Sequence, residues 1–86
     1  MQLEPTEIKA TITRLKKANG HLASVIRMLE EGADCEAALM QLAAVNKAIN
    51  RGAYALVATG LEQCLLEGGR ESVDAQKLEK LFLALA

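Results

Sequence analysis

The sequence is nearly without aromatic residues: its 86 residues include one Tyr, one Phe and no Trp, although 51% are hydrophobic. The core must therefore be built from Leu, Ile, Val and Ala, a composition that suits helices packed on helices. Proline occurs only at Pro5, and no segment shows the alternation of a strand. We predict an all-α chain that forms a single domain over residues 1–86.

Long apolar runs and an export signal are also missing. No stretch approaches the roughly 20 apolar residues that span a bilayer, and the start Met1–Pro5 is neither basic nor apolar. We therefore expect a cytoplasmic protein that does not bind a membrane. Its two cysteines, Cys35 and Cys64, would then be reduced thiols, available for metal or redox chemistry. There is no acid–base pair or phosphate loop, and we expect no enzyme.

Acidic residues are missing from two long segments. None occurs from Ile8 to Leu29 or from Ala37 to Leu61, although the net charge of the chain is −1. A positive face of this kind attracts a polyanion by counterion release, whereas the alternative is an ordinary solvated helix face. The two segments carry seven basic residues: Lys9, Arg14, Lys16, Lys17, Arg27, Lys47 and Arg51.

The pattern of apolar residues, caps and glycines predicts three helices, which are long, long and short. The first should begin near Pro5–Thr6 and end at Gly32. The second should begin after Asp34, a good N-cap, and end at Gly68–Gly69. The third should follow Ser72, another good cap. Such a long–long–short chain cannot close a core alone, but two copies packed antiparallel can make a four-helix-bundle dimer.

Two features of the long helices bear on their packing. Gly52 and Gly60 in the second helix should weaken it only locally. The first helix carries apolar residues in alternating steps of four and three, the pattern of a helix that packs along its length against a partner. This stripe consists of Ile8, Ile12, Leu15, Leu22, Ile26 and Leu29.

Three segments carry a family resemblance: ITRLKKANGH (12–21), IRMLEEGADCEAALMQLAAVNKAI (26–49) and LEQC (61–64). They resemble the copper-sensitive operon repressor (CsoR) family of bacterial transcriptional repressors, over about residues 8 to 66 and without gaps. The resemblance implies an all-helical protein that assembles as a dimer of dimers. It also implies binding to operator DNA without a helix-turn-helix, and release of the DNA when an inducer reacts at the cysteines.

The cysteines indicate a subtype within that family. Cys35 and Cys64 match the two cysteines of its copper sensors and persulfide sensors, but Gly60 stands where copper sensors have a histidine. The pattern is similar to the CsoR-like sulfurtransferase repressors (CstR). It therefore implies a persulfide or polysulfide inducer and no resident metal or cofactor. Cu(I), held by Cys35 and Cys64, is the alternative inducer, since two thiolates suit this soft ion.

The spacing of the cysteines constrains how they can react together. They lie 29 residues apart (64 − 35), which is about 43 Å along a continuous helix. The two sulfurs of one chain therefore cannot meet, whereas Cys35 of one chain can lie beside Cys64 of an antiparallel partner and form a sulfur bridge. The alternative is that both are small buried hydrophobic residues.

The resemblance also implies a DNA-binding face, built around the basic positions Arg14 and Arg51. His21 replaces a usual Gln, and Ala23–Ser24 stand where a basic residue is usual, so DNA affinity could be reduced. A competing interpretation is a helical interaction module that has lost operator binding. The expected DNA-binding residues are Arg14, Lys16, Lys17, His21, Lys47 and Arg51.

Overall fold

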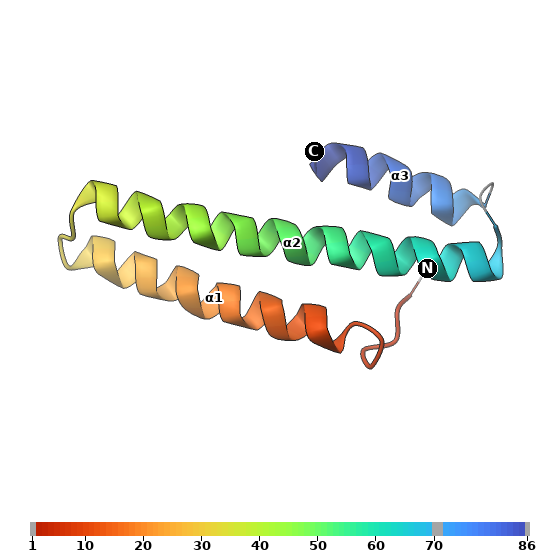
Figure 1. The fold of residues 1–86 in the computed structure, drawn as a ribbon, viewed down its shortest axis with the longest axis horizontal. Coiled ribbons are helices and arrows are strands. Elements are labelled where there is room, and N and C mark those ends of the chain that lie inside the picture. The colour runs from red at the N-terminus through yellow and green to blue at the C-terminus, as the bar shows by residue number, and fades with distance from the viewer. Residues whose placement is uncertain (1, 70–71, 86) are drawn as a thin grey trace.

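The structure, a computed structural model, describes residues 2–69 and 72–85 and contains three helices in that part of the chain: α1 (Lys9–Glu30), α2 (Cys35–Glu67) and α3 (Val73–Leu85). α1 and α2 form a long antiparallel hairpin, and α3 folds back along the other side of α2 (Figure 1). No strand occurs in the described residues. The predicted all-α arrangement of long, long and short helices is confirmed, with α2 as the central element.

Local chemistry fixes three of the helix boundaries as predicted. After α1, Gly32 takes a φ of 79°, a conformation that favours glycine and lets the chain turn. The Asp34 carboxylate accepts a hydrogen bond from the Ala37 N–H at 3.2 Å and caps α2. The Ser72 hydroxyl accepts one from the Ala75 N–H at 3.1 Å and caps α3.

The predicted start of α1 near Pro5–Thr6 is wrong, because the helix begins at Lys9. Residues 5–8 form a turn instead, and the Glu7 N–H donates to the Glu4 carbonyl at 2.9 Å. Ile8 occupies the N-cap position and makes no side-chain capping bond. Without a capping oxygen, the sequence carries no local signal for this boundary.

The seam between α1 and α2 consists mainly of small residues at intervals of seven. Small side chains at a helix contact let the two backbones approach closely, whereas large ones hold the axes apart. The buried seam positions are Thr11, Ala18 and Val25 on α1, and Ala38, Val45 and Gly52 on α2.

The predicted leucine and isoleucine stripe of α1 therefore lies mostly outside the seam within the chain, although its Leu15 packs against Gly52. Ile26 and Leu29 are 49% and 55% exposed, and the rest of the stripe is only half-buried. The small heptad occupies the contact because it permits the shorter separation between the helices. Packing of the stripe against another copy of the chain stays a prediction.

The three helices lie in a single layer. The molecule measures 52 × 26 × 13 Å and its radius of gyration is 16.4 Å, where a compact domain of this length would have about 12 Å. One layer cannot enclose a core, and fifteen large apolar side chains of the described residues are more than a third exposed. A second layer is needed to bury them.

We expect Asp34→Ala to lower the free energy of unfolding by about 1 kcal/mol, because the Ala37 N–H loses its acceptor. Asp34→Asn is the matched control, since its side-chain oxygen caps equally well. Urea unfolding at one fixed protein concentration measures both variants, because association would make the stability depend on concentration. Equal losses in the two variants would contradict the capping role.

Candidate functional site

A basic groove runs between α1 and α2. It has a volume of about 400 Å³ and is lined by Arg14, Lys17 and His21 from α1 and by Arg51 from α2, over a floor of alanines. Four of the six predicted DNA-binding residues thus come together on one surface. Lys16 and Lys47 are exposed but do not line the groove.

His21 is hydrogen-bonded to a residue of α2 that the sequence did not single out. Its Nε2 lies 2.7 Å from the Gln41 Oε1. The amide oxygen can only accept, so this hydrogen bond forms in the tautomer with the proton on Nε2. The positions of these two residues, about equally far from the turn at Gly32, would have brought them together in any antiparallel hairpin. This bond joins α1 to α2 and fixes the imidazole at the groove.

Gly52 sets the spacing of α1 and α2 beside Arg51. A Cβ atom built on Gly52 would lie 2.9 Å from Leu15 Cδ2 and 3.3 Å from Leu15 Cγ, so the leucine occupies the space that a side chain would need. Besides the local weakening of the helix that we expect, this glycine thus has a packing role. Because Gly52 has no side chain, α1 can approach α2 closely at the point where Arg14 and Arg51 line the same groove.

The two cysteines lie at opposite ends of α2. Cys35 is the first residue of the helix and is exposed, whereas Cys64 lies in the last turn and is only 6% exposed. α2 is continuous over all the residues between them, so the rise of an α-helix separates them by about 43 Å. The structure confirms the continuous helix, and the two thiols of one chain cannot react with each other.

Cys64 lies beneath α3, in a buried cluster with Ala75 and Leu78. It also borders a hollow of about 250 Å³ at the turn between α2 and α3. The residues that line the hollow with Cys64 are Glu67, Gly68, Ser72, Val73 and Asp74.

Gly60, one helical turn before Cys64, is covered by α3. A Cβ atom there would lie 3.2 Å from Leu78 Cδ1, so any side chain at this position would require Leu78 to move. In residues 2–69 and 72–85, no three His, Cys, Asp or Glu side chains come together as a metal site. Two thiolates from two chains would suit Cu(I), but α3 fills the place of a third ligand at residue 60.

The sequence profile of the metal-sensitive transcriptional repressors matches residues 7–86. The chain belongs to this family. The copper-sensing transcriptional repressor CsoR of Mycobacterium ulcerans (strain Agy99) is 38% identical over 71 residues, which cover 77% of the chain and 61% of that relative. CsoR of Mycobacterium tuberculosis (strain ATCC 25618 / H37Rv) is 36% identical over 77 residues, 90% of the chain and 65% of the relative. The expected membership of the CsoR family is confirmed.

The chain spans less than two thirds of the length of these two curated CsoR relatives. The uncharacterized protein YrkD of Bacillus subtilis (strain 168) is 42% identical over 53 residues, which cover 62% of the chain and 84% of YrkD. No solved structure matches the chain. Among the described residues of this repressor-family chain, no helix combines the length and apolar character needed to cross a bilayer.

We expect Gly52→Ala and Leu15→Ala to be energetically coupled. In the parent, the new methyl group meets Leu15, and this contact cancels much of the gain of about 1 kcal/mol that Ala brings to a helix interior. In the Leu15→Ala background the methyl group has space and the gain should appear. Urea unfolding of the four proteins measures a coupling of about 0.5 kcal/mol or more, and additive effects would contradict the contact.

Proposed function

We propose that this chain is a thiol-switched transcriptional repressor. It binds operator DNA through the basic groove and releases the DNA when Cys35 and Cys64 of neighbouring subunits react with persulfide or polysulfide. The observation that carries the proposal is the gathering of Arg14, Lys17, His21 and Arg51 in one groove, in a chain of a transcriptional repressor family.

The groove supports DNA binding through phosphate neutralisation. Two arginines and a lysine surround it, and a lysine or arginine that neutralises a phosphate releases condensed counterions. Contacts to phosphates set the position of a protein on DNA, whereas base contacts determine specificity. In this role the exposed Lys16 and Lys47 extend the same positive surface.

The functional unit in this proposal is a homodimer that pairs into a homotetramer. Leu22, Leu39, Leu42 and Ile49 border an apolar hollow of about 510 Å³ on the face of α1 and α2. A second copy of the flat chain, packed antiparallel on this face, would bury the hollow and complete a four-helix bundle. In that arrangement Cys35 of one chain lies beside Cys64 of the partner subunit.

Persulfide chemistry can link the two thiols without another oxidant. Cys35 Sγ attacks the outer sulfur of a small persulfide R–S–SH, the bond between the two sulfurs of the donor breaks, and R–SH leaves with the proton. Cys64 of the partner subunit then attacks the inner sulfur of the Cys35 persulfide and releases hydrosulfide. The transferred sulfur is reduced to sulfide as the two thiols are oxidised to a disulfide.

Cu(I) is a second candidate inducer, favoured by the copper-sensing relatives. Cys35 and a partner's Cys64 would supply two soft thiolate ligands, which is enough for a near-linear site. Against this candidate, Gly60 offers no ligand and is packed against Leu78. Persulfide is therefore favoured because Gly60 supplies no third copper ligand, whereas Cu(I) is favoured by the copper-sensing relatives.

We expect Arg14→Ala combined with Arg51→Ala to weaken binding to the DNA upstream of its own gene by about tenfold or more. The loss of two phosphate contacts should also reduce the slope of log affinity against log salt by about 2. Fluorescence anisotropy with labelled DNA measures both quantities. The control is Lys77→Ala with Lys80→Ala, which removes two exposed charges from α3. If the arginine variant binds as tightly as the parent, the groove is not the DNA-binding surface.

We expect cysteine persulfide to release the DNA from the reduced protein and to join its chains by two or more sulfur atoms. Intact-mass spectrometry under non-reducing conditions measures the links. Cys35→Ser and Cys64→Ser should each prevent linking, because a bridge needs both sulfurs. Release by Cu(I) alone, with stoichiometric binding and no linked chains, would select the copper alternative.

A further inference from the structure

α3 is held on α2 by two separate contacts, and the first covers Cys64. Leu78 is 7% exposed and lies over Gly60, where a Cβ would come within 3.2 Å of its Cδ1. Ala75 is 5% exposed and completes the cluster around the thiol. Cys64 is thus buried by two side chains of a neighbouring helix.

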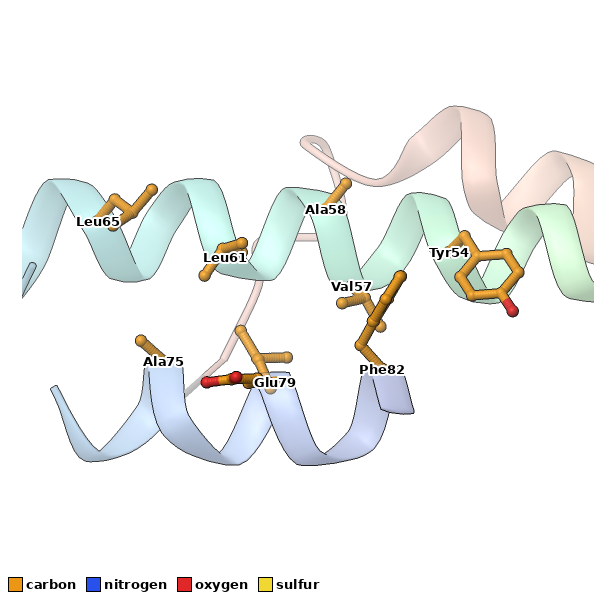
Figure 2. A pocket seen from close by; sticks show the side chains of 9 residues that line it. Tyr54, Val57, Ala58, Leu61, Leu65, Ala75, Glu79 and Phe82 are labelled. Carbon is orange, nitrogen blue, oxygen red and sulfur yellow. The ribbon is translucent and has the colours of Figure 1, made fainter. Parts of the chain in front are cut away.

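The second contact lies toward the other end of α3, beside Tyr54. The rings of Tyr54 and Phe82 pack in a tilted arrangement, with their centroids 5.5 Å apart and their planes inclined at 59°. The Tyr54 hydroxyl donates to the Leu85 carbonyl at 3.3 Å. Figure 2 shows α3 lying along α2, with Phe82 directed toward Val57.

Apart from these contacts, α3 is weakly held. Within residues 2–69 and 72–85 it packs only on α2, and its outer side chains Val73, Leu81 and Leu83 are 67%, 55% and 64% exposed. An apolar hollow of about 510 Å³ remains between the two helices, bordered by Leu61, Leu65 and Phe82 (Figure 2). A short helix with few buried contacts opens at a lower free energy than the rest of a fold.

We propose that α3 is a gate over Cys64: while it is docked it limits reaction at the thiol, and added atoms on the sulfur displace it. This inference rests on the proposed role of Cys64 as a sensing thiol. In the closed state of this gate, Leu78 of α3 is packed on Gly60 of α2.

An atom added to Cys64 Sγ and the docked helix α3 compete for the same space, because the side chains around the thiol are closely packed. Buried side chains in contact leave no space for an additional atom, so a larger group must displace a neighbour. When Cys64 Sγ attacks the persulfide on Cys35 of the partner subunit, the new S–S bond places a sulfur atom beside Ala75 and Leu78, and hydrosulfide leaves. Because Cys64 is only 6% exposed beneath α3, another sulfur atom reaches it only once α3 has moved.

The gate is tested by the rate at which N-ethylmaleimide alkylates each cysteine in the full-length, reduced protein without DNA. Gly60→Ala pushes on Leu78 from α2, and Leu78→Ala removes the covering side chain from α3. We expect each to speed alkylation of Cys64 about tenfold and to leave Cys35 unchanged, as measured by peptide mass spectrometry. The matched control is Leu83→Ala, which shortens an exposed leucine of the same helix and should change neither rate.

Gly60→Ala keeps the test decisive even if Leu78→Ala unfolds. Alanine favours the helix interior, so faster labelling of Cys64 cannot come from a weaker α2. If Cys64 in the Gly60→Ala protein reacts no faster than in the parent, or if Leu83→Ala speeds it equally, the gate is refuted.

The reverse coupling provides an independent readout, since coupling between two sites is reciprocal. In the Cys35→Ser protein only Cys64 can be alkylated, and hydrogen exchange then follows α3 before and after labelling. We expect the amides of α3 to exchange about tenfold faster after labelling and those of α1 to keep their rates. Unchanged exchange in α3 would overturn the proposal.

Neither experiment contains DNA, so a failure of the repressor assignment leaves both results valid. Conversely, DNA release by persulfide with unchanged labelling rates would support the proposed function and reject the gate alone.

Discussion

The close approach of two helices to the glycines of α2 is the constraint on which the rest of the structure depends. Leu15 from α1 occupies the space beside Gly52, and Leu78 from α3 occupies the space beside Gly60. Each glycine lowers the intrinsic stability of the helix, but each lets a neighbour lie closer than any other residue would allow. One contact brings basic residues of two helices to a single groove, and the other covers a cysteine.

A layer of three helices is the second consequence of this packing. The small residues of the seam bring α1 and α2 together without burying many large side chains, so leucines such as Leu39 and Leu42 stay exposed. In the proposed dimer, a second chain would cover these side chains and supply the buried area that a single layer lacks. In that proposal the reacting thiols meet only between subunits, so association and reactivity would depend on the same surface.

The sequence predicted the features that local chemistry determines and missed those that depend on tertiary contacts. Asp34 and Ser72 cap their helices as expected, since a capping oxygen acts within one turn. Ile8 at the start of α1 carries no such oxygen, and the helix begins later than the sequence indicates. Hydrophobic periodicity does not reveal the seam, because it favours large residues, whereas the seam consists mainly of small ones with Leu15 packed against Gly52. The acid-free segments predicted the basic groove, but no local pattern indicates that α3 folds over Cys64.

The contact of Tyr54 with α3 has a practical consequence. The chain has one tyrosine and no tryptophan, so its tyrosine absorption and emission come from a single place in the fold. That place is the ring packed on Phe82, with its hydroxyl bonded to the end of α3. The protein therefore carries a built-in optical reporter of whether its last helix is in place, and no added dye is required.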